Sequence, residues 1–118
     1  MCSSDLNHFV NSALNDKAVV HSYNGIILNE NLKSQMVGHD FHRDMPWFPM
    51  CRTGIVIIIP LMTFSAKNGS TEFVPGTHLF KEKPSKKYLK QNFVSSSGNA
   101  GDAYVVDGAT WQIGRAHV

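Results

Sequence analysis

After residue 18 the chain alternates short apolar runs with turn residues. Such runs, rich in β-branched and aromatic residues, are typical of strands rather than helices. The run Ile55–Ile59 is too short for a buried helix and predicts a fully buried strand. Asn68-Gly69 between two apolar runs predicts a hairpin. The whole pattern favours an all-β sandwich or barrel, with strands over residues 18–28, 33–40, 53–62, 72–74, 93–94 and 103–106.

Two segments depart from this strand pattern. Residues 5–14 predict a short helix, because apolar residues such as Phe9 and Val10 fall on one helical stripe behind Asp5 as the N-cap. Residues 81–90 carry five lysines and a proline. We interpret this lysine-rich segment as a solvated loop or short helix, in preference to a patch for an anionic substrate.

The length, charge and cysteine content of the chain exclude several classes of protein. A chain of 118 residues allows one domain with a modest core. The formal net charge of +2 is too small to indicate a nucleic-acid partner. Two cysteines make no disulfide framework, and no apolar run is long enough to span a bilayer. We therefore expect a cytoplasmic protein with neither nucleic acid nor membrane as partner.

The candidate chemistry lies in His42-Arg43-Asp44. In a strand, residues two apart point to the same face, so His42 and Asp44 can take adjacent positions on one metal ion. Non-haem Fe(II) oxygenases use two histidines and one carboxylate in this way. A lone His-x-Asp is a weak signal, and a polar strand end is the commoner origin of such a pair. Asp40 shares the face of these two residues, whereas His39 points away from them.

Three motifs together resemble the phytanoyl-CoA dioxygenase family of Fe(II)/2-oxoglutarate oxygenases. The first is His42-Arg43-Asp44 followed by Met-Pro-Trp, and the second is the segment Asn68–His78, which ends in Pro-Gly-Thr-His. The third is the Gly-Asp strand over residues 101–107. The resemblance covers roughly residues 23–111. It implies a double-stranded β-helix, a jelly-roll variant, which is truncated at its C-terminus and has a short helix at its N-terminus.

The same resemblance implies a site and a reaction. His42 and Asp44 match the family's first two iron ligands and act as its catalytic pair, while His78 falls in a structural turn. The family's second iron histidine corresponds to Gln112. The implied cofactors are Fe(II) and 2-oxoglutarate, with O₂ as co-substrate. The implied reaction hydroxylates a small-molecule C–H and releases succinate and CO₂. The residues expected to line the pocket are Asn29, Trp47 and Ile58.

The end of the chain departs from the family. Residues 113–118 match what one reading frame of a common sequencing adapter encodes, so we expect a partial oxygenase domain over residues 1–112 followed by an artefact. On this hypothesis the Gln112 codon begins as a histidine codon does, and the parent protein has histidine there. The family's 2-oxoglutarate-binding arginine would lie in a missing segment, and the fragment alone should be inactive.

Two other readings stay open. A cupin-like metalloprotein would share the fold class, but such proteins tend to use His-x-His, and Asp44 argues against that. A non-catalytic jelly-roll binding module is the second alternative, and a genuine glutamine at position 112 would favour it.

Overall fold

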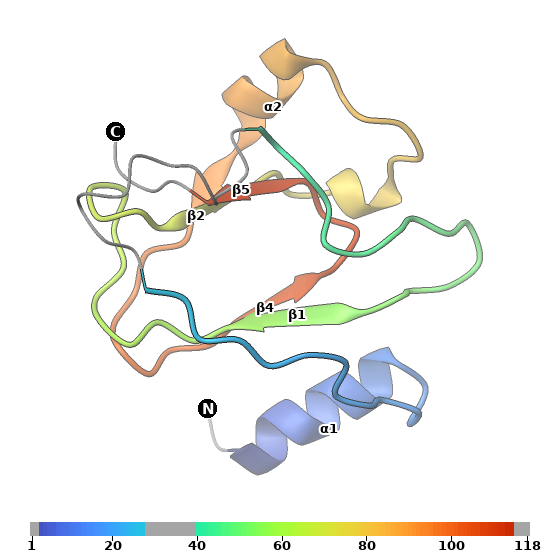
Figure 1. The fold of residues 1–118 in the computed structure, drawn as a ribbon. Helices are drawn as coiled ribbons and strands as arrows, with labels where there is room; N and C mark the ends of the chain where they lie inside the picture. Colours follow the sequence, from blue (N-terminus) through green and yellow to red (C-terminus); the bar gives the residue numbers. More distant parts are fainter. Residues whose placement is uncertain (1–2, 28–39, 115–118) are drawn as a thin grey trace.

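A computed structural model describes residues 3–27 and 40–114, which form two helices, one 3-10 turn and five strands (Figure 1). Within these residues no helix is long and apolar enough to cross a membrane. The elements in chain order are α1 (Ser3–Ala13), β1 (Ile55–Ile58), β2 (Thr71–Phe73), η1 (Thr77–Leu79), α2 (Lys86–Asn92), β3 (Val94–Ser95), β4 (Tyr104–Asp107) and β5 (Gln112–Gly114).

The described strands form two small antiparallel sheets (Figure 1). One sheet pairs β1 with β4, so that Ile55 lies opposite Asp107. The other has the order β3-β2-β5 and places Phe73 opposite Gln112. The β-rich arrangement is compatible with the expected jelly roll. Each sheet joins strands that are distant in the sequence. Strands β4 and β5 follow one another in the sequence but lie in different sheets, and the loop 108–111 connects them.

The predicted hairpin at Asn68-Gly69 is wrong, because the strands on its two sides belong to different sheets. The turn itself exists. The Ser65 carbonyl accepts the N–H groups of Asn68 (3.1 Å) and Ser70 (3.3 Å), and Gly69 has φ 86°. Glycine adopts this left-handed conformation without the steric cost that other residues meet. Turn chemistry therefore located the reversal correctly, but it could not specify which strands pair.

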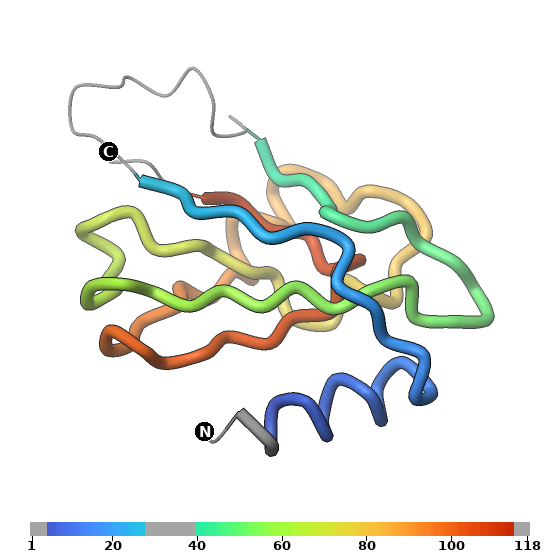
Figure 2. Tube along the Cα trace, turned by 60° about the horizontal axis from the view of Figure 1, so that its bottom comes forward, coloured from blue at the N-terminus to red at the C-terminus, as the bar shows by residue number. Residues whose placement is uncertain are grey.

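Two strand predictions need correction. The run at β1 is not fully buried: the side chains of Ile57 and Ile59 are 37% and 51% exposed. Residues 18–27 form no strand, and Tyr23 is 94% exposed. Strand propensity is realised only where a neighbouring edge supplies hydrogen bonds and a packing surface. Figure 2 shows this segment crossing the molecule as an extended trace after α1. The predicted strand at 33–40 lies outside the described residues except for Asp40.

The N-terminal helix was predicted nearly correctly. It begins at Ser3, so Asp5 lies in its first turn rather than at the N-cap. Leu6, Val10 and Ala13 are half-buried, whereas Phe9, expected on the same stripe, is 53% exposed.

The core lies between α2 and the outer face of the sheet β3-β2-β5. Leu89 of α2 is fully buried against Val74 and Phe41. The helix begins after Ser85, whose side chain accepts a hydrogen bond from the Tyr88 N–H (3.2 Å), as N-cap residues do. The lysine-rich segment is thus in part a short helix, as expected. Phe41 in this core fixes the position of the next residue, His42. Around these three, the half-buried residues of the core are Phe93, Trp111 and Ile113.

Candidate metal centre

The candidate site forms where the segment 40–45 lies against the segment 108–112. His42 and Gln112 exchange both backbone hydrogen bonds at 2.9 Å. The Gly108 carbonyl accepts the N–H groups of Asp44 (3.2 Å) and Met45 (2.8 Å). A Cβ on Gly108 would lie 2.5 Å from the Met45 Cγ, so this close approach requires glycine. Backbone pairing thereby brings positions 42, 44 and 112 to one place.

The three side chains meet there. His42 Nε2 lies 3.4 Å from Asp44 Oδ1, and the Gln112 amide donates a hydrogen bond to Asp44 Oδ2. Gln112 is only 5% exposed, whereas the side chains of His42 and Asp44 are 44% and 36% exposed. The arrangement is a partly open polar site with one buried wall.

A contact on the other ring nitrogen orients His42. Its Nδ1 lies 3.3 Å from the Asp40 carbonyl oxygen. A carbonyl can only accept, so this contact is a hydrogen bond when Nδ1 carries the proton. That tautomer leaves the lone pair of Nε2 facing Asp44. Metal-binding histidines are commonly oriented by such a bond from the second nitrogen.

These residues fit Fe(II) in part. A neutral imidazole and a carboxylate are ligands that non-haem iron accepts, and their spacing suits adjacent coordination positions. The Gln112 amide is a poor third ligand, and it already engages the Asp44 carboxylate. In residues 3–27 and 40–114, this site included, no three histidine, cysteine, aspartate or glutamate side chains gather into a group that could hold a metal.

Thr77, not His78, connects the Pro-Gly-Thr-His motif to this site. Thr77 is fully buried; its Oγ1 donates to the Val74 carbonyl (2.6 Å) and accepts the Trp111 N–H (3.0 Å). It thus holds the residue that precedes Gln112. The positive φ of Gly76 (79°) makes the turn that aims Thr77 inward. The motif itself was visible in the sequence, but this role was not.

Arg43 faces away from His42 and Asp44, as alternation along an extended backbone requires for the residue between them. Its guanidinium donates to four backbone carbonyls, including Ala109 (2.7 Å) and Thr77 (3.1 Å), and lies 4.7 Å from the ring centroid of Trp111. Burial lowers the pKa of Arg43, because it removes water that stabilises the charged guanidinium. Arg43 therefore fastens the segment 40–45 to the η1 turn and to the loop before β5, a role that the sequence did not indicate.

Two of the three predicted pocket residues, Trp47 and Ile58, lie in the described part of the chain. Trp47 lines a pocket of about 270 Å³ together with His78 and the loop 46–53, and neither His42 nor Asp44 lines it. Ile58 pairs with Tyr104 at the last residue of β1 and lines neither this pocket nor the one formed by Asp40, Phe41, Lys86 and Lys90. Asn29 lies outside the described residues.

Comparisons with known proteins add a family and two relatives. The sequence model of the family described as "Phytanoyl-CoA dioxygenase (PhyH)" matches residues 1–117. Two similar proteins are "Uncharacterized protein Rv1501" of Mycobacterium tuberculosis and "Uncharacterized protein Mb1539" of Mycobacterium bovis. Each is 31% identical over 109 residues, which cover 86% of this chain and 39% of the relative. No solved structure matches the chain.

Proposed function

The chain belongs to the phytanoyl-CoA dioxygenase family, and on that premise we propose that it contributes the His42–Asp44 part of the metal centre of an Fe(II)- and 2-oxoglutarate-dependent oxygenase. The observation that supports this most is the backbone bridge between His42 and Gln112, which places position 112 beside the Asp44 carboxylate. Two histidines and one carboxylate at these positions would complete the ligand set of a non-haem iron oxygenase.

In this proposal His42 and Asp44 hold Fe(II), and position 112 provides the third ligand when it is histidine. The Asp40 carbonyl keeps the proton on Nδ1 of His42 and thereby leaves Nε2 free for the metal. Bound Fe(II) supplies the chemistry that couples O₂ and 2-oxoglutarate to the hydroxylation of a small-molecule C–H, with release of succinate and CO₂. The half-exposed His42 and Asp44 side chains leave room for these molecules.

A carboxylate clamp for 2-oxoglutarate has to come from elsewhere in the protein. Of the arginines in the described residues, Arg43 donates to backbone carbonyls, and Arg52 forms an ion pair with Asp107 (2.7 Å). The Arg43 guanidinium is held by carbonyls, and Arg52 already pairs with a carboxylate of the described chain, so neither is offered to a second, bidentate carboxylate. The chain spans 39% of the length of its mycobacterial relatives. We therefore assign the clamp, and catalytic turnover, to the whole protein rather than to these 118 residues.

The test is an anaerobic Fe(II) titration of the chain and of its Gln112→His variant. We expect Gln112→His to bind Fe(II) at least about tenfold more tightly, because imidazole replaces an amide in the ligand set. His42→Ala and Asp44→Ala, each in the Gln112→His background, should abolish this gain. His78→Ala is the matched control, since His78 lies on η1, outside the contacts of the site. Folded Gln112→His protein with no Fe(II) binding would refute the proposal.

The identity of residue 112 in the parent protein has its own test. Sequencing the source gene through codon 112 and beyond should give histidine, followed downstream by the arginine of the clamp. A glutamine codon there would mean that this protein keeps the fold without the ligand set.

A non-catalytic binding module is the alternative that one observation favours. The Gln112 amide is buried and bonded to Asp44, which gives this polar group a partner without any metal. On this alternative, Gln112→His should lower stability without creating an Fe(II) site, so the same titration separates the two functions.

A further inference from the structure

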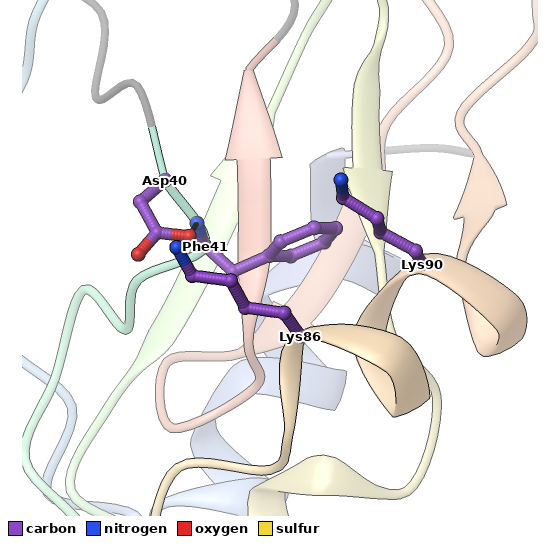
Figure 3. A pocket seen from close by; sticks show the side chains of 4 residues that line it. All are labelled: Asp40, Phe41, Lys86 and Lys90. Carbon is purple, nitrogen blue, oxygen red and sulfur yellow. Dashed lines mark hydrogen bonds between the residues drawn. The ribbon is translucent and has the colours of Figure 1, made fainter.

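Lys83 forms bonds that the other lysines near α2 do not. Its Nζ donates to the Asp40 carboxylate (2.8 Å) and to the Phe41 carbonyl (2.7 Å), and it lies 5.1 Å from the ring centroid of Trp111. Lys86 and Lys90 line a pocket of about 230 Å³ with Asp40 and Phe41 (Figure 3), yet within the described part of the chain the ammonium group of neither makes a hydrogen bond or ion pair. Lys83 is thus bonded to the backbone just before His42.

Lys83 bonds the peptide unit before His42 directly, through the Phe41 carbonyl, and the preceding peptide unit indirectly, through the Asp40 carboxylate. The Asp40 carboxylate also accepts the Phe41 N–H (2.8 Å), so carboxylate, amide and ammonium form one closed network. The Phe41 side chain is buried in the core with Val74 and Leu89. The Asp40 carbonyl, held at the start of this network, is the acceptor 3.3 Å from His42 Nδ1.

We propose that Lys83 is a positioning residue for His42: by bonding Asp40 and Phe41 it holds the Asp40 carbonyl against Nδ1, and so sets which ring nitrogen carries the proton. The inference rests on the proposed function only for its consequence, which is that Nε2 stays available as a metal ligand. The ring contact itself requires no metal. Asp44, 3.4 Å from Nε2, competes for the same proton. Loss of Lys83 therefore shifts the equilibrium between the two neutral tautomers of His42 toward the one protonated on Nε2.

The exposure of this network makes the idea testable without unfolding the protein. The side chains of Lys83 and Asp40 are 37% and 55% exposed. Exposed ion pairs contribute little to stability, because solvent screens them and the side chains lose freedom. Removing the Lys83 ammonium should therefore leave the fold intact and move the His42 ring.

The first readout is the ring-nitrogen NMR spectrum of His42 in the metal-free chain, at a pH where the imidazole is neutral. Lys83→Met should lower the population protonated on Nδ1 at least about twofold, since the bond from Nδ1 is what holds it there. Lys83→Arg keeps a donor for both acceptors and should restore the wild-type spectrum. Lys90→Met makes the same charge change in the same patch and should alter nothing. An unchanged His42 spectrum in Lys83→Met overturns the proposal.

The second readout is Co(II) affinity in the Gln112→His background. Lys83→Met should weaken binding about threefold to tenfold, somewhat below the usual loss for a residue that bonds a metal ligand directly. Lys83→Arg should bind within twofold of the parent, and Lys90→Met should be equal to it. Absence of Co(II) binding in every variant would refute the proposed function, whereas the metal-free ring spectrum would still decide the role of Lys83. Equal affinity in Lys83→Met and Lys90→Met would overturn that role.

Discussion

Residues 18–27 and residues 70–77 reverse the usual relation between polarity and burial. The first segment is rich in apolar residues, yet Val19, Val20 and Ile27 are each more than 85% exposed. The second contains Ser70 and Thr77, which are at most 1% exposed. The difference lies in the backbone. Residues 71–73 pair with strands on both sides, whereas residues 18–27 pair with none in the described part. Burial in this molecule follows strand pairing and packing more closely than it follows hydropathy.

We expect the largest change in the free energy of unfolding when a core leucine is truncated, and almost none when an exposed isoleucine is truncated. Leu89→Ala should lower the free energy of unfolding by about 2–5 kcal/mol, because it leaves a cavity between α2 and the sheet. Ile27→Ala should change it by less than about 0.5 kcal/mol, since the side chain is 89% exposed. Urea unfolding of both variants measures the contrast. Equal losses of stability would mean that residues 18–27 are packed in solution, so that their apolar side chains would not differ in burial from residues 70–77.

Thr77→Val tests whether buried polar contacts hold the second segment. The valine keeps the shape but leaves the Trp111 N–H without its acceptor, which should cost about 1–3 kcal/mol. Thr77→Ser keeps the hydroxyl and serves as the matched control. Chemical denaturation compares the two variants. A Thr77→Val protein as stable as Thr77→Ser would show that the hydroxyl contributes only volume.

The smallest effect concerns pH. The hydrogen bond from Lys83, followed by that from the Phe41 N–H, lowers the pKa of Asp40 below its ordinary value of 3.8. A carboxyl with a lowered folded-state pKa adds stability above its unfolded-state pKa and loses it as the pH falls through the folded-state value. The contribution should therefore be present at pH 5 and disappear below about pH 3.8. Thermal unfolding of wild type and Asp40→Asn from pH 6 to pH 2.5 should converge at the acid end. Curves that stay parallel would contradict the Lys83–Asp40 contact.

The sequence predicted the site better than it predicted the sheets. The His-x-Asp spacing could be read from a local motif, and the resemblance to the family indicated residue 112; the structure brings these side chains together. Their role as metal ligands stays a prediction. Strand pairing could not be read in the same way, because Asn68-Gly69 specifies a turn and not the partners of the strands beside it. The roles of Arg43 and Lys83 also escaped prediction, since both bond backbone atoms of segments that are distant in the sequence.

In the proposed metal site, backbone pairing with His42 makes position 112 the third ligand position. X-ray absorption at the cobalt edge of Co(II)-loaded Gln112→His protein tests it most directly, because imidazole ligands give distinctive outer-shell scattering. We expect two imidazoles on the metal, and one in the His42→Ala, Gln112→His double variant. A single imidazole in Gln112→His, or a count unchanged by His42→Ala, would show that residues 42 and 112 do not share a metal.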